Sequence, residues 1–80
     1  MKELKIHNLV RYYREKNAFS QKKLAQLSNV SQPTISGIET QKIQYPCSST
    51  RTKLAKAFNV NVGNVFFPDK YSMLRSLKSL

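Results

Sequence analysis

Apolar residues recur at helical spacing in short blocks along this chain, and residues that favour turns and helix caps separate the blocks. The first block spans about residues 6–16, where four apolar side chains follow the i, i+3, i+4, i+7 pattern of one helix face. These four are Ile6, Leu9, Val10 and Tyr13. We expect Tyr13 to face inward and Tyr12 to be the exposed aromatic, and we expect Asn17 to end the helix in a left-handed conformation.

Two further helices are predicted directly after the first. Ser20 is a good N-cap for a helix over Gln21–Ser28, and Ser31 is one for a helix over residues 32–40. The residues expected on the inner side are Leu24, Ala25 and Leu27 in the first of these helices and Ile35 and Ile38 in the second.

A loop over residues 41–48, marked by Pro46, is expected to precede a fourth helix. Either Ser48 or Ser49 should cap this helix, and Asn59 should end it. Its apolar set is Leu54, Ala55, Ala57 and Phe58.

A fifth, short helix is expected to begin after Asn61 and to close at Pro68, with Val62, Val65 and Phe66 as its apolar residues. No strand-like alternation competes with these helices, so the chain is predicted to be all-α. An 80-residue chain has room for one modest core. We expect a compact five-helix domain over residues 1–68, followed by a tail over residues 69–80. Leucines recur every three residues in the tail, which favours a short amphipathic helix or a dimerisation segment.

The segment over residues 21–40 meets the physical demands of a helix-turn-helix, in which a short turn joins two steeply crossed helices. Asn29 can adopt the positive φ that the turn needs. The first turn of the second helix is expected to expose the short polar residues Gln32 and Thr34. The core of the unit is expected to consist of Leu24, Ala25, Val30, Ile35 and Ile38, with Ala25 where the helices approach and Val30 as an apolar plug under the turn.

The sequence over residues 20–39, SQKKLAQLSNVSQPTISGIE, resembles the XRE-type helix-turn-helix of phage Cro and repressor proteins. The similarity continues through LAKAFNV at residues 54–60 and through Val65 and Phe66, so it covers roughly residues 6–67. This resemblance implies a lambda-repressor-like domain that binds operator DNA, usually as a dimer, to control transcription. Some positions depart from the family pattern: Asn29, Gln41 and Asn59 stand where the family often has glycine.

The charge balance agrees with an anionic partner. Fourteen Lys and Arg residues face four Asp and Glu residues, which gives a net charge of +10. Nucleic acid is the first candidate for such a partner, and an anionic membrane surface is the second. No long apolar run predicts a membrane span, and the polar N-terminus does not resemble a signal peptide. A single cysteine, Cys47, fits the reducing cytoplasm.

The same composition argues against catalysis and against metal binding. One His and one Cys do not make a structural zinc site. Hydrolysis needs clustered carboxylates, metal ligands or a nucleophile beside a base, and four scattered acids do not supply these. We therefore expect no catalytic residue, no cofactor and no metal.

The residues expected to contact base edges are Gln32, Pro33, Thr34 and Gly37. A glutamine that opens a recognition helix can pair with the N6 and N7 atoms of adenine. Pro33 fits the first helical turn and can contact a thymine methyl group or only stiffen that turn. Gly37 costs about 1 kcal/mol in mid-helix, so it is either merely tolerated or permits close approach to the bases.

The residues expected to contact the DNA backbone are Gln21, Ser31, Ser36, Lys42, Gln44 and Tyr45. Gln21 opens a helix whose N-terminal amides can meet a phosphate. Lys42, Gln44 and Tyr45 lie in a loop that, by the resemblance, meets the backbone. The resemblance also implies an ion pair between Arg14 and Glu39 that fixes the orientation of the recognition helix.

The leading hypothesis is therefore a sequence-specific regulator, a repressor of the kind found in phages or mobile elements. As a homodimer it would read a palindromic operator in double-stranded DNA through the major groove. The alternative is that the same fold serves as an antitoxin-like module that holds a protein partner.

Overall fold

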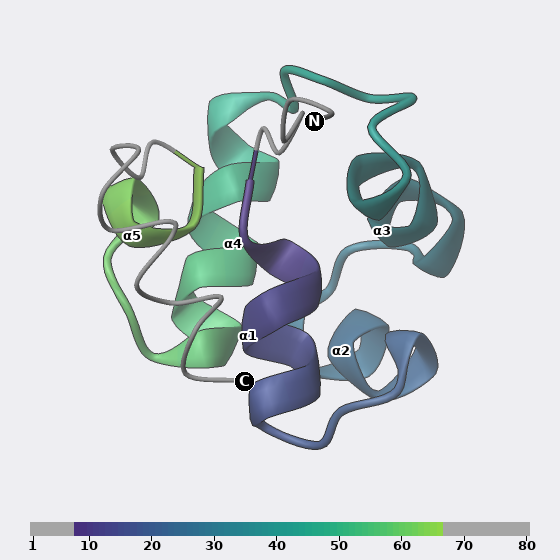
Figure 1. Ribbon diagram of the computed structural model, residues 1–80, viewed down its shortest axis with the longest axis vertical. Coiled ribbons are helices and arrows are strands. Elements are labelled where there is room, and N and C mark those ends of the chain that lie inside the picture. The colour runs from purple at the N-terminus through teal and green to yellow at the C-terminus, as the bar shows by residue number, and fades with distance from the viewer. Residues whose placement is uncertain (1–7, 67–80) are drawn as a thin grey trace, which may run out of the picture.

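The computed structural model describes residues 8–66, and those residues contain five helices and no strand (Figure 1). The helices are α1 (Val10–Lys16), α2 (Gln21–Ser28), α3 (Gln32–Glu39), α4 (Ser48–Phe58) and α5 (Val62–Phe66). The predicted all-α, five-helix fold is thus confirmed. The tail over residues 69–80 and the closing Pro68 lie outside the described residues, so the division at residue 68 stays a prediction.

In Figure 1, α1 and α4 lie in the middle of the domain, with α2 and α3 on one side and α5 on the other. Helix α1 contacts α3, α4 and α5, and α2 contacts both α3 and α4. A backbone hydrogen bond of 2.7 Å from Leu9 to Val65 ties the start of α1 to α5. The core that these contacts enclose consists of Val10, Leu24, Val30, Ile35, Ile38, Leu54, Ala55, Phe58, Val65 and Phe66.

Helix α1 is shorter than the sequence pattern predicted. It begins at Val10 and not near residue 6, because the Asn8 side chain accepts a hydrogen bond from the Val10 N–H and Leu9 has non-helical backbone angles. At its other end Asn17 has φ −91°, and Ala18 takes the left-handed conformation with φ 58° instead. Ala18 and Phe19 donate backbone hydrogen bonds to the carbonyls of Glu15 and Arg14, which is the Schellman pattern of a helix end.

The predicted roles of the two tyrosines in α1 were wrong for Tyr12. Tyr12 is buried, whereas Tyr13 is half-buried and packs against the core. The reason lies in the neighbours: the Tyr13 ring meets Tyr12 edge-on at 5.0 Å and stacks on Phe58 at 5.6 Å. The Lys16 ammonium lies over the Tyr12 ring, 5.6 Å from its centre.

The bounds of α2 agree with the prediction, and Ser20 caps it by accepting a 2.9 Å hydrogen bond from the Lys23 N–H. Asn29 has φ 60°, so it supplies the left-handed turn residue as predicted. Leu27, however, was predicted to face inward and is 48% exposed. Leu24 takes the fully buried position on this helix, so Leu24 and not Leu27 anchors α2 in the core.

The predicted cap of α4 was also wrong. Ser48 is the first residue of the helix and Cys47 is its N-cap, since the Cys47 carbonyl accepts the first helical bond from the Arg51 N–H. The preceding Pro46 is buried, so the chain turns into α4 immediately after it leaves the core. Asn59 ends α4 with φ 58°, as predicted.

Candidate nucleic-acid interface

Helix α3 divides sharply into a buried side and an exposed opening turn. Ile35 and Ile38 are fully buried, while Gln32 and Pro33 are exposed. Thr34, Ser36 and Gly37 are half-buried. One helix thus anchors itself in the core and leaves its first turn open to a partner.

The hydroxyls of Ser31 and Thr34 hold the opening turn of α3 in shape. The Ser31 Oγ accepts a hydrogen bond from the Thr34 N–H, at 3.4 Å, and lies 2.8 Å from the Thr34 Oγ1. The Thr34 hydroxyl is therefore already engaged inside the turn. Pro33 lies in the first turn of α3, where its missing N–H leaves no helical bond unmade.

An ion pair between Arg14 of α1 and Glu39 holds the far end of α3. The guanidinium donates from Nε to Oε2 at 2.6 Å and from Nη2 to Oε1 at 3.1 Å. The side chains are only 15% and 5% exposed, respectively. The hydrogen bonds that Arg14 donates to Glu39 raise the pKa of Arg14 above its ordinary value, so the guanidinium stays charged.

Two further contacts at this end of α3 are ones the sequence pattern did not predict. The Gln21 side-chain amide donates to Glu39 Oε1 at 3.3 Å, and the Asn8 amide donates to the Ile38 carbonyl at 3.2 Å. Arg14 also donates to the Phe19 carbonyl at 2.9 Å. The first turn of α2, the end of α1 and the end of α3 are therefore linked through the Glu39 carboxylate.

Gly37 lies where α3 meets the following loop. A Cβ added at Gly37 would lie 2.8 Å from Cδ1 and 3.1 Å from Cγ1 of Ile43. The Ile43 N–H also donates to the Gly37 carbonyl at 3.0 Å. The missing side chain therefore makes room for Ile43, which is a packing reason for glycine that neither sequence-based alternative included.

This packing predicts coupling between the two positions. Gly37→Ala should gain about 1 kcal/mol of helix propensity, and displacement of Ile43 should offset that gain. In an Ile43→Ala background the nearest remaining side-chain atom, Cβ, is 3.9 Å away, so the same change should stabilise the domain. Urea unfolding of the four proteins should give a coupling of about 1 kcal/mol, and additive effects would contradict the packing role.

The loop after α3 is exposed where the sequence predicted contacts with the DNA backbone. Lys42 and Gln44 are exposed, and Tyr45 is 85% exposed. Gln41 turns the chain into this loop with φ 67°, a conformation that favours the glycine found in the resembled family. At the end of the loop, hydrogen bonds with Thr50 lower the pKa of the exposed Cys47 thiol.

The charges on the described surface suit a polyanion. Both carboxylates within residues 8–66 lie in ion pairs, Glu39 with Arg14 and Glu15 with Arg11 at 3.4 Å. Lys22 and Lys23 on α2 and Lys42 in the loop are exposed. Negative charge beside the helix-turn-helix is thus neutralised internally, whereas these lysines remain available to phosphates.

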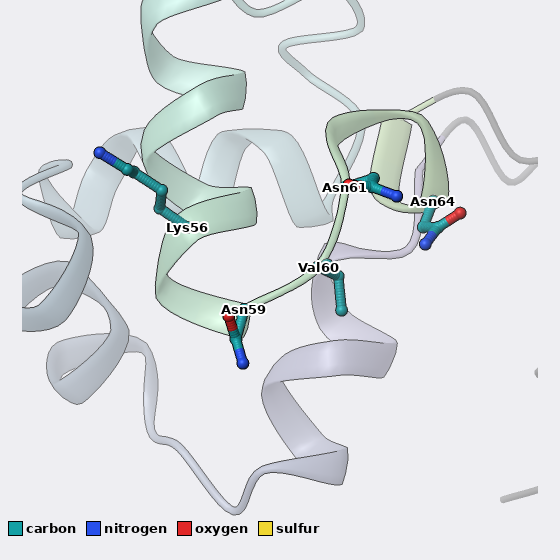
Figure 2. Close-up of a pocket in the computed structure, with 5 residues that line it drawn as sticks. All are labelled: Lys56, Asn59, Val60, Asn61 and Asn64. Carbon is teal, nitrogen blue, oxygen red and sulfur yellow. The ribbon is translucent and has the colours of Figure 1, made fainter.

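A shallow depression of about 390 Å³ lies elsewhere on the domain, where α4 turns into α5 (Figure 2). It is lined by Lys56, Asn59, Val60, Asn61 and Asn64. In Figure 1 helices α5 and α3 lie on opposite sides of the domain, so this depression is remote from the opening turn of α3. Its lining offers three asparagine amides, the Val60 side chain and the Lys56 amino group, and among the described residues it contains no carboxylate, thiol or imidazole.

Within residues 8–66 the structure brings together no group of three or more His, Cys, Asp or Glu side chains that could hold a metal ion. Among the described helices, none combines the length and apolar character needed to cross a membrane.

Residues 29–31 form a three-residue turn between α2 and α3, with a left-handed first residue, a buried apolar second and a capping third. Together with the small Ala25 packed against the core, these features define a helix-turn-helix domain.

The comparison with protein families agrees: the model of the family described as Helix-turn-helix matches residues 10–63, more than half of the chain. The chain belongs to this XRE-type helix-turn-helix family, which is a family of DNA-binding regulatory domains. No curated protein and no solved structure matches the chain significantly.

Proposed function

We propose that this protein is a sequence-specific transcriptional repressor of the phage or mobile-element type that binds a palindromic operator in double-stranded DNA. The observation that supports this most is the exposed opening turn of α3 on a helix otherwise locked into the core at Ile35 and Ile38. In helix-turn-helix proteins the N-terminal residues of this helix contact base edges in the major groove. Gln32, Pro33 and Thr34 are the residues assigned to that role.

The flanking elements are assigned to the DNA backbone. The first amides of a helix have no intrahelical acceptor, so the backbone N–H groups of Gln21 and Lys22 are suited to a phosphate. The Gln21 side chain already donates to Glu39, so its phosphate contact is assigned to the main chain. Ser31, Ser36, Lys42, Gln44 and Tyr45 complete the proposed contacts with the DNA backbone.

A homodimer on the operator fits this reading. Two recognition helices must lie about 34 Å apart to enter successive major grooves on one side of the duplex. The operator is then an inverted repeat, and the protein acts in the cytoplasm or nucleoid, where such DNA is accessible.

The salt dependence of binding tests both the DNA contact and the dimer. Each phosphate neutralised adds about −0.9 to the slope of log K against log salt concentration. Lys42→Ala should therefore make the slope shallower by about 0.9 if one protomer binds, and by about 1.8 if two bind. Fluorescence anisotropy on a selected palindromic duplex measures these slopes.

Lys56→Ala is the matched control, because Lys56 is also exposed but lies beside the depression at α4 and α5. Its slope should equal that of the wild-type protein. Equal slopes for the wild-type and Lys42→Ala proteins would show that the loop does not contact the DNA backbone through Lys42. A change of the slope near 0.9 would show that one protomer binds, which would contradict the proposed dimer.

A further inference from the structure

The loop after α3 is fastened to the domain by one side chain between its two ends. The stretch over residues 42–45 lies between Gln41, which turns the chain with φ 67°, and the buried Pro46. Within this stretch Ile43 is half-buried and packs against the core, whereas the other three residues are exposed. Ile43 is therefore the side chain that fixes the middle of the loop.

Ile43 contacts α3 at Gly37 through both its main chain and its side chain. The Ile43 N–H donates to the Gly37 carbonyl at 3.0 Å. Its Cδ1 and Cγ1 atoms lie 2.8 Å and 3.1 Å from the position that a Cβ on Gly37 would occupy. The isoleucine thus lies against the helix where any other residue would carry a side chain, and it fits there because residue 37 is glycine.

This contact fixes the neighbours of Ile43 relative to α3. Lys42 and Gln44 precede and follow Ile43, are exposed, and are assigned to the DNA backbone. The helix to which Ile43 is fastened carries the opening turn that is assigned to base edges. Ordering a loop during binding costs free energy, and a loop that is already held in its bound position avoids that cost. The packing of Ile43 therefore prepares the loop for DNA before binding.

Resting on the proposed function, we propose that Ile43 is a positioning residue for DNA binding. Its packing in the space left by Gly37 joins the loop to α3, so that Lys42 meets a phosphate when α3 lies in the major groove. Gly37 then acts through Ile43, and not by admitting the bases closer to the helix. The helix and the loop form one rigid surface for the duplex.

The test measures the salt dependence of operator binding by fluorescence anisotropy, with the full chain and a palindromic duplex selected from a random pool. Ile43→Ala releases the loop, so its slope should become shallower by as much as that of Lys42→Ala, about 1.8 for a dimer. Combining the two substitutions should give the slope of Lys42→Ala alone, because both remove the same phosphate contact. Ile43→Val removes Cδ1 but keeps a γ carbon against Gly37, so it should retain the wild-type slope.

Gly37→Ala tests the same contact from the side of the helix. Its Cβ would displace Ile43, so the slope should again become shallower. In the Ile43→Ala background the nearest remaining side-chain atom is 3.9 Å from that Cβ, so Gly37→Ala should change neither the slope nor the affinity there. Equal losses of affinity in both backgrounds would mean that Gly37 acts toward the bases, which would overturn the inference.

Val60→Ala is the matched control, because Val60 is also half-buried and packs against the core but lines the depression at α4 and α5. It should lower the stability of the domain and leave the salt slope unchanged. Circular dichroism verifies that each variant is folded at the temperature of the binding measurement. A wild-type slope for Ile43→Ala, beside a shallower one for Lys42→Ala, would overturn this inference and leave the proposed function intact. Failure of the wild-type protein to bind any duplex would overturn both.

Discussion

Glu39→Gln is expected to lower the free energy of unfolding by about 3 kcal/mol, because it leaves the Arg14 guanidinium without its anionic partner in a site that is only 15% exposed. Removing one partner of a buried pair typically costs about 3–5 kcal/mol, and the partial exposure of Arg14 places this pair at the lower end. For a domain of this size, the melting temperature should fall by about 12–24 °C.

Glu15→Gln is the matched control, because Glu15 pairs with Arg11 four residues away on α1. The two side chains of that pair are 48% and 70% exposed, respectively, and exposed pairs at this spacing contribute about 0.3–0.5 kcal/mol. Thermal melts followed by circular dichroism compare the two substitutions directly. Equal losses at Glu15 and Glu39 would show that the Arg14–Glu39 pair contributes no more than a surface contact.

Operator affinity provides a second measurement on the same variant. Glu39 links α3 to α1 through Arg14 and to α2 through Gln21, so its neutralisation should loosen the end of α3. Affinity measured well below the melting temperature should therefore fall for Glu39→Gln and stay unchanged for Glu15→Gln. If the Glu39→Gln protein is destabilised but binds the operator with wild-type affinity, the Arg14–Glu39 pair contributes to the stability of the domain and not to DNA recognition.

The parts of the fold that could be predicted from sequence are those that local chemistry determines. Ser20 and Ser31 mark the starts of α2 and α3 because a side-chain oxygen can satisfy an N–H three residues ahead. Asn29 and Asn59 mark turns because a short polar side chain tolerates positive φ. Each of these features needs only neighbours in the chain, so a pattern of residues is sufficient to predict it.

Two features of α1 could not be predicted in the same way. Ala18 takes the left-handed conformation because Phe19 must reach back to the Arg14 carbonyl, although alanine does not favour that conformation. Tyr12 is buried, with the Tyr13 ring edge-on to it and the Lys16 ammonium over its ring, and Tyr13 itself stacks on Phe58 of α4. Helical spacing alone gave no reason to expect that Tyr12 would be more deeply buried than Tyr13.

The features of the candidate site also divide into those that the local sequence predicts and those that depend on residues far apart in the chain. The exposed start of α3 follows from the positions of Ile35 and Ile38, because two buried residues define which side of a helix faces the core. The Gln21–Glu39 and Asn8–Ile38 hydrogen bonds join residues 18 and 30 positions apart, respectively. The space that Gly37 leaves for Ile43 depends on the path of a loop, which no local rule specifies.

Leu24→Ala is expected to lower the free energy of unfolding by about 3–4 kcal/mol, whereas Leu27→Ala should lower it by less than about 1 kcal/mol. Leu24 is fully buried between α2, α3 and α4, so its truncation removes apolar contacts and leaves a cavity. Leu27 is 48% exposed, so truncation removes little buried area and improves helix propensity slightly. Urea unfolding of both variants measures the difference.

This pair isolates burial from every other variable, because the two leucines occupy the same helix and undergo the same substitution. The sequence pattern placed both on the inner side of α2 and so predicts two large losses of similar size. The packing of α2 on α3 and α4 predicts one large loss and one small one. Similar losses at both positions would mean that the Leu27 side of α2 is covered in solution, and the arrangement of α2 described above would be wrong.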